Sequence, residues 1–200
     1  MAGKILRFVP FLRMAALNGS IVRGQENKES DIDILIIARA GRLYICRFFA
    51  ILFIHFSGWR RHGRKIAGRI CLNCFLSNKD LSIFPENKKS ASKVAKAYKY
   101  LIPLVDDGSA KKFLKTNAWF DDFKINGAAH CELLKDLAFT KFPLEKKNTI
   151  FSRLLSGKTG DWLEKKLMSY QVRRILSRKI KGDETFADRL RIKLHPKKIE

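Results

Sequence analysis

The chain has 200 residues, 46% of them hydrophobic, so it can bury a sizeable core, and its composition excludes a disordered protein. The formal net charge is +22, and both halves share the excess: 14 basic against 5 acidic side chains in residues 1–85, and 27 against 14 in residues 86–200. This charge predicts attraction to a polyanion, with RNA or DNA first and anionic lipid or a nucleotide-rich substrate second; the alternative interpretation is a charge that serves solubility alone.

The N-terminal residues 4–17 are predicted to form an amphipathic helix that Pro10 interrupts or starts. Asn18, Gly19 and Ser20 follow as a break that a turn or a helix N-terminus accommodates. A new element is expected to begin directly after this break.

A polar loop over residues 24–30 is predicted to lead into a strand over residues 31–38, which is rich in β-branched side chains. Because side chains alternate along a strand, Asp31 and Asp33 share one face while Ile32 shares the other with its apolar neighbours. Two carboxylates therefore project together from one strand.

The next element, residues 43–59, is strongly apolar and predicts a helix. Arg47 and His55 interrupt it, and its uninterrupted apolar part is far shorter than the roughly 20 residues of a transmembrane helix. We therefore expect a helix buried between a sheet and a second layer and no transmembrane segment, with packing in a homodimer interface as the alternative.

A basic loop over residues 60–65 precedes a second predicted strand, residues 69–77, in which Asn73 is the polar interior residue. Cys71 and Cys74 form a CxxC in this strand, but a spacing of three directs their side chains to opposite faces, and no second pair completes a zinc site. Four cysteines without the density of a disulfide scaffold favour a reducing, cytoplasmic location.

From residue 87 onward the apolar spacing is mainly helical, with periodic groups around Val94, Phe113 and Leu133. The clearest helix is predicted over residues 161–181, with Trp162, Leu167 and Leu176 among its apolar side chains. Its basic side chains indicate either a track for nucleic acid or phosphate or the solvated face of a core helix.

The paired aspartates are the residues that indicate chemistry. Asp31 and Asp33 repel each other unless a cation lies between them, and Mg²⁺, or Mn²⁺, binds through one or two carboxylates together with substrate phosphates. The upstream Gly19 allows close backbone approach to a phosphate, Ser20 offers a hydroxyl, and we expect backbone N–H groups there to be free to donate.

The run Leu17-Asn18-Gly19-Ser20, followed after ten residues by Asp31-Ile32-Asp33-Ile34, resembles the signature of the DNA polymerase β-like nucleotidyltransferase superfamily, as in a small prokaryotic-type member. The resemblance implies that Gly19 and Ser20 bind the nucleotide phosphates and that Asp31 and Asp33 coordinate two divalent ions. It also implies transfer of a nucleoside monophosphate from an NTP to an acceptor, with pyrophosphate leaving.

The superfamily normally supplies a third carboxylate from a later strand, and here Asn73 occupies the plausible position of that ligand. An amide oxygen is neutral and cannot act as a base, so Asp80 or the pair Asp106-Asp107 are the alternatives. Basic residues of the 60–65 loop, with Arg23, are candidates for neutralising the leaving group, whereas His62 is interpreted as structural or solvent-facing.

The predicted fold class is α/β (α+β): a small mixed β-sheet nucleotidyltransferase core over residues 1–85, flanked by helices, and a helical, basic C-terminal region over residues 86–200. The first functional hypothesis is a metal-dependent nucleotidyltransferase. The second is a catalytically impaired fold that binds RNA or nucleotide, and the third is a regulatory module of the toxin–antitoxin type.

Overall fold

The computed structural model describes residues 2–27, 29–61, 66–85, 88–128, 130, 142–143, 150–179 and 185–194. In chain order its elements are α1 (Ala2–Leu6), β1 (Leu12–Leu17), η1 (Ile21–Arg23), β2 (Ile32–Ala38), α2 (Leu43–Phe56), β3 (Ile70–Ser77), α3 (Lys88–Tyr98), β4 (Ile102–Asp106), α4 (Ser109–Thr116), η2 (Ala118–Asp122), β5 (Phe142–Pro143), α6 (Ile150–Leu154), α7 (Lys158–Leu176), β6 (Phe186–Ala187) and β7 (Arg191–Lys193). The predicted α/β class is confirmed.

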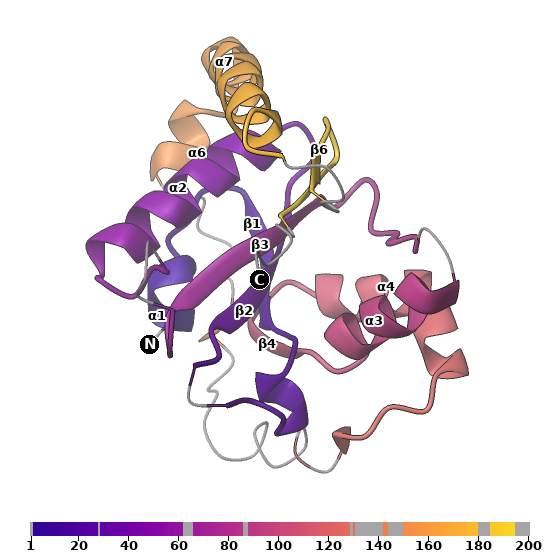
Figure 1. The fold of residues 1–200 in the computed structure, drawn as a ribbon. Coiled ribbons are helices and arrows are strands. Elements are labelled where there is room, and N and C mark those ends of the chain that lie inside the picture. Colours follow the sequence, from indigo (N-terminus) through magenta and orange to yellow (C-terminus); the bar gives the residue numbers. More distant parts are fainter. Residues whose placement is uncertain are drawn as a thin grey trace.

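One mixed sheet with the strand order β5-β4-β1-β2-β3-β7-β6 forms the middle layer. The β1–β2 and β1–β4 pairs are antiparallel, whereas β2 and β3 are parallel and are joined through α2. Helices α1, α2 and α7 cover one face of the sheet, and α3 and α4 cover the other, as Figure 1 shows. The sheet therefore separates two hydrophobic cores.

The helix predicted over residues 4–17 is wrong. A short helix ends at Leu6, the backbone of Phe11 takes a left-handed φ of 62°, and the chain then enters the central strand β1. Ala15 contacts one core and Ala16 the other, both fully buried. Because β1 is buried on both faces, its apolar run lacks the alternation that marks a half-exposed strand, and tertiary packing overrides the helix propensity of its residues.

The strands predicted over residues 31–38 and 69–77 are confirmed as β2 and β3, and the helix predicted within residues 43–59 is confirmed as α2. Helix α2 packs between the sheet and α7, as Figure 1 illustrates. None of the helices in the described ranges combines the length and the hydropathy that a bilayer span requires.

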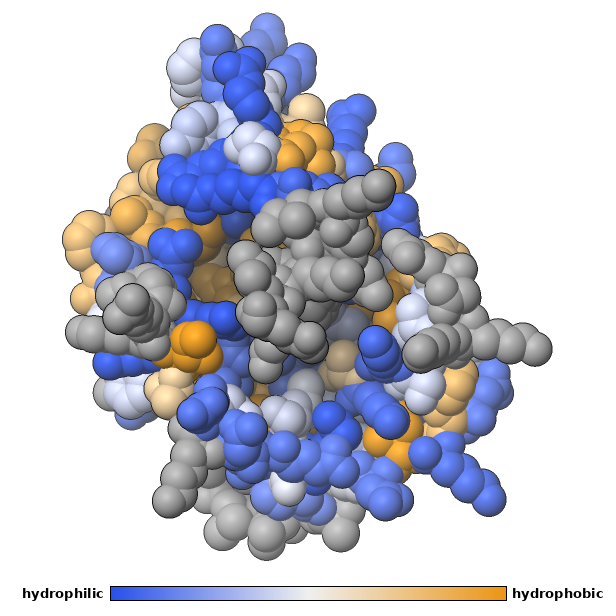
Figure 2. Space-filling model, in the orientation of Figure 1, coloured by the Kyte–Doolittle hydropathy of each residue, from blue (hydrophilic) through white to orange (hydrophobic). Residues whose placement is uncertain are grey.

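The long C-terminal helix predicted over residues 161–181 is present as α7, which begins earlier, at Lys158, and ends at Leu176. Trp162 and Leu176 were expected on its apolar side, but they are 60% and 47% exposed. Leu167 and Ile175, which were expected on the same side, do pack against the core, and Gln171 is buried with them because this side faces α2. Figure 2 shows mainly hydrophilic side chains over the outer end of α7.

Outside α7, the helical spacing around Val94 corresponds to α3 and that around Phe113 to α4. The group around Leu133 lies outside the described residues, as do His62 with the rest of residues 62–65.

Helix α7 also supplies the cap of α2. The first turn of α2 lacks a side-chain cap of its own, and the two carboxylate oxygens of Glu164 accept hydrogen bonds from the backbone N–H groups of Tyr44 and Ile45, each at 2.9 Å. Arg42 joins the same contact by donating to the carbonyls of Leu155 and Ser156. The N–H groups that a helix leaves unpaired at its start are thus satisfied across the helix pair.

Candidate active site

Three chain segments meet at one edge of the sheet. Strand β1 ends there at Leu17, opposite Ile34 of β2. Strand β3 begins there at Ile70, and its second residue, Cys71, lies opposite Asp33. The turn after β1 therefore comes directly beside the first residues of β2 and β3.

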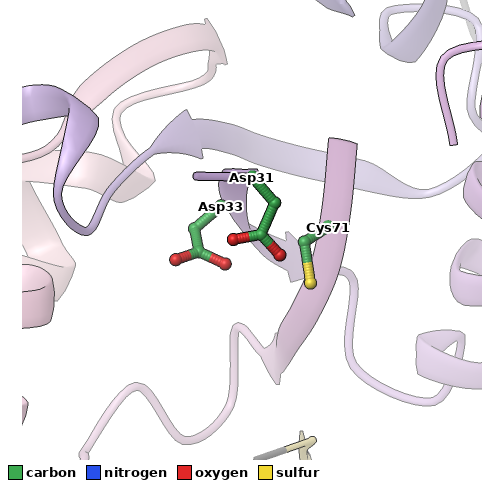
Figure 3. A group of neighbouring side chains, drawn as sticks. All are labelled: Asp31, Asp33 and Cys71. Atoms are coloured by element: carbon green, nitrogen blue, oxygen red, sulfur yellow. The ribbon is translucent and has the colours of Figure 1, made fainter. Parts of the chain in front are cut away.

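The site contains two carboxylates and a thiol. A ligand atom from each of Asp31, Asp33 and Cys71 lies within 4.8 Å of the other two. Figure 3 shows these side chains projecting together from the start of β2 and β3. The predicted projection of the two aspartates from one face is thus present.

Cys71 reaches this position because of a β-bulge. The register between β2 and β3 shifts by one residue, so that Asp33 pairs with Cys71 whereas Leu35 pairs with Cys74. The extra residue reverses the alternation, and Cys74 packs in the core beneath α3, on the sheet face that also carries Asp33. The prediction that Cys71 and Cys74 point to opposite faces is therefore wrong. The described cysteines, including both of these, are free thiols.

The negative charge of the site is only partly balanced. Arg61 forms an ion pair with Asp31. Burial, together with the neighbouring Asp31 carboxylate, raises the pKa of Asp33 to about 7, against the opposing effect of Arg61. Burial, with help from both aspartates, raises the pKa of the Cys71 thiol to about 12. Arg61 therefore balances the charge of Asp31, while the Cys71 thiol stays neutral at pH 7.

Gly19 forms the wall of the site next to Asp33. Its φ is 81°, and a Cβ atom built at this position would lie 2.8 Å from Oδ2 of Asp33. The turn therefore requires glycine twice, for its left-handed backbone and for the space that the carboxylate occupies. The backbone N–H of Gly19 donates to the carbonyl of Ala97 at 2.9 Å, so the expectation that this group is free for phosphate is wrong.

Ser20 follows the turn as the first residue before η1, and its hydroxyl makes no capping hydrogen bond there. Beside it, Nε of Arg23 donates to the carbonyl of Gly19 at 3.2 Å, and burial lowers the pKa of Arg23. Asn18 is 2% exposed, and its Oδ1 is buried without a hydrogen-bond partner. The turn thus carries a hydroxyl, a guanidinium and an unpaired amide oxygen.

Asn73, the expected third-ligand position, does contact the site. Its Nδ2 donates to Oδ1 of Asp33 at 2.6 Å, while its own Oδ1 is buried without a partner. In this arrangement the amide nitrogen, and not the oxygen, faces Asp33. Cys71 is therefore a better candidate for the third ligand than Asn73, which the sequence indicated.

The alternative carboxylates lie at the opposite edge of the sheet. Asp80 follows Ser77, which pairs with Ala38 at the far end of β2, about 20 Å away at 3.3 Å per residue. Asp107 forms an ion pair with Arg13 at 2.8 Å, and Asp106 lies opposite Met14. Neither alternative approaches Asp31 and Asp33.

The donor set fits a divalent cation. Two carboxylates are the ligands that Mg²⁺ and Mn²⁺ prefer, and a thiol admits softer ions as well. Burial and the Asp31 carboxylate raise the pKa of Asp33, and a bound cation would oppose both effects.

Two residues of this site were missed by the reasoning from sequence. The role of Cys71 depends on the bulge, which the sequence does not mark. Arg61 was included only as a member of the basic loop, and the register that brings it to Asp31 is set by its backbone hydrogen bond to Ile70.

A model of the nucleotidyltransferase domain family matches residues 3–154, about three quarters of the chain. This range includes every residue of the cluster and of the Gly19 turn. Comparisons with curated proteins and with solved structures gave no match.

Proposed function

Because the chain belongs to the nucleotidyltransferase domain family, we propose that it transfers a nucleoside monophosphate from an NTP to a hydroxyl-bearing acceptor and that the reaction depends on Mg²⁺ or Mn²⁺. The observation that supports this most strongly is the close packing of the Gly19 backbone against Asp33, whose carboxylate lies beside that of Asp31. This contact supports the proposal because a turn that can approach phosphates then lies directly beside two carboxylates that can hold a divalent ion.

In this proposal Asp31, Asp33 and Cys71 hold the divalent ion, which supplies the positive charge that a triphosphate needs when it approaches two carboxylates. Ser20 donates its hydroxyl to a phosphate oxygen, since it has no capping role. Because Gly19 has no side chain, the phosphates can approach the backbone closely at this turn.

Arg61 has a charge-balancing role. Its ion pair with Asp31 holds the guanidinium at the rim of the site, with 41% of its side chain exposed. From there it can turn toward the leaving pyrophosphate, whose negative charge increases in the transition state. Asn73 orients Asp33 through its amide N–H.

The test is pyrophosphate release from each NTP with Mg²⁺ or Mn²⁺, in the presence of candidate RNA, protein and small-molecule acceptors. We expect Asp31→Asn and Asp33→Asn to abolish release. The matched control is Asp107→Asn, which removes an ion-paired aspartate at the opposite edge of the sheet. Release that is unchanged in both site variants would refute the proposal.

A second candidate is a catalytically impaired module that binds RNA or nucleotide, including a regulatory module of the toxin–antitoxin type. Two observations favour it. The described part of the chain contributes two carboxylates to the cluster and no third carboxylate, and the net charge is +22. It predicts polyanion binding that weakens steeply with salt and survives Asp31→Asn and Asp33→Asn. Such binding without pyrophosphate release from any NTP would favour this candidate.

A further inference from the structure

A second cavity lies away from the candidate active site. Its volume is about 640 Å³, within the range of small-molecule sites, and α2, α7 and the segment around Arg60 line it. Helices α2 and α7 cover the sheet face opposite to the one that carries Asp33. The nucleotide of the proposed reaction therefore does not occupy this cavity.

The cavity is lined by positive charge. Four arginines contribute to it, Arg47, Arg60, Arg174 and Arg178, and none of its described lining residues carries a carboxylate. The charges affect one another: burial and, after it, Arg60 lower the pKa of Arg47 to about 10, while burial and, after it, Arg174 lower the pKa of Arg60. Like charges are held together here without a described acidic partner inside the cavity.

Arg47 lines the cavity from α2. Its Nη1 donates to Oε1 of Gln171 at 2.6 Å, its guanidinium lies 5.5 Å from the ring centre of Phe75, and its Nε is buried with no hydrogen-bond partner. The contacts with Gln171 and Phe75 hold the guanidinium of Arg47 in a fixed position beside the cavity. A positive charge held in this way favours an anionic ligand in the cavity.

The walls of the cavity are apolar. Phe48, Ile51 and Leu52 line it from α2, and Leu167 and Ile175 from α7. Such walls favour a ligand that carries an apolar or planar group over a bare inorganic ion. Several arginines converging on one point favour phosphate, because the guanidinium group matches phosphate oxygens in paired hydrogen bonds.

We propose that this cavity binds a small organic phosphate, with the phosphate between Arg60 and Arg174 above Arg47 and the organic group against the apolar walls. The site is separate from the proposed catalytic function and does not depend on it. A nucleoside monophosphate and an alkyl phosphate share this chemistry and differ only in the group that contacts the walls.

The test is calorimetric titration of the full chain, in the presence of a chelator, with AMP, octyl phosphate and inorganic phosphate. We expect at least one organic phosphate to bind at least tenfold more tightly than inorganic phosphate, and the stronger of the two identifies the organic group. The Asp31→Asn variant keeps this binding, which separates it from nucleotide binding at the candidate active site.

We expect Arg60→Gln and Arg174→Gln each to weaken binding of the preferred organic phosphate by about tenfold, as loss of one charge-assisted hydrogen bond predicts. The matched control is Arg173→Gln, since Arg173 lies on α7 beside Arg174 but does not line the cavity. Thermal unfolding confirms that each variant is folded. Equal affinity in all three variants, or no preference over inorganic phosphate, would overturn the proposal.

Discussion

Replacing Gly19 with alanine tests the geometry of the candidate active site most directly. The new Cβ would lie 2.8 Å from Oδ2 of Asp33, a distance that real Cβ atoms do not adopt, so the carboxylate must move. A φ of 81° adds about 1–2 kcal/mol of backbone strain in any residue other than glycine. For a chain of this size that strain lowers Tm by about 2–8 °C.

The effect on function is expected to be much larger than the effect on stability. A displacement of a reacting group by about 1 Å costs about 100-fold in rate, so we expect Gly19→Ala to lower metal-dependent pyrophosphate release by at least this factor and to weaken Mn²⁺ binding. The matched control is Gly41→Ala. Gly41 has a similar φ of 73°, but a Cβ there meets no atom within 4 Å.

Both variants should therefore lose similar stability in thermal unfolding, and only Gly19→Ala should lose Mn²⁺ binding, measured by electron paramagnetic resonance of free Mn²⁺. The reasoning is refuted if Gly19→Ala binds Mn²⁺ as well as Gly41→Ala does. This readout remains available whichever of the two candidate functions is correct.

Three further outcomes follow from contacts described above. Because the folded-state pKa of Asp33 is raised to about 7, its protonated form stabilises the metal-free fold at low pH, and that stability is lost as the pH rises toward and through 7. In chelator, Tm should therefore fall over this interval in the wild type but less in Asp33→Asn, and saturating Mn²⁺ should abolish the fall in the wild type. Cys71→Ser should weaken binding of Co²⁺ or Cd²⁺ by at least about tenfold, remove the sulfur-to-Co²⁺ absorption band, and leave Mg²⁺ binding nearly unchanged. Cys74→Ser is the control and should keep that band, and an unchanged band in Cys71→Ser would exclude a metal–sulfur bond. Glu164→Ala should remove the cap of α2 and lower the free energy of unfolding, measured by chemical denaturation, by about 1–3 kcal/mol. The control is Lys165→Ala at the neighbouring exposed position, and a loss of stability in Glu164→Ala no larger than in this control would contradict the capping role.

The aspartate pair could be predicted from sequence because its information is local. Alternation along a β-branched run places Asp31 and Asp33 on one face regardless of what surrounds the strand, and a glycine before a short helix is typical of a turn. These features depend on a few consecutive residues, so no tertiary contact was needed to find them.

The parts that could not be predicted depend on pairing between distant segments. Strand β1 is buried on both faces, so its apolar run imitates a helix until β2 and β4 are placed beside it. Cys71 reaches the carboxylates only through a bulge defined by its partner strand. The capping of α2 by Glu164 joins residues about 120 positions apart, a separation at which a sequence pattern carries no signal.

In the short extended segment over residues 59–61, the number of residues determines to which side of the sheet two arginines point. Trp59 and Arg61 each form a backbone hydrogen bond with Ile70, so the two successive arginines, 60 and 61, point to opposite sides of the sheet, one toward the arginine-lined cavity and the other toward Asp31. Inserting one residue between Trp59 and Arg60 would turn each of the two side chains to the other side of the sheet, so that both arginines would lose their present contacts at once. The length of this segment thus couples the candidate active site to the arginine-lined cavity on the other side of the sheet.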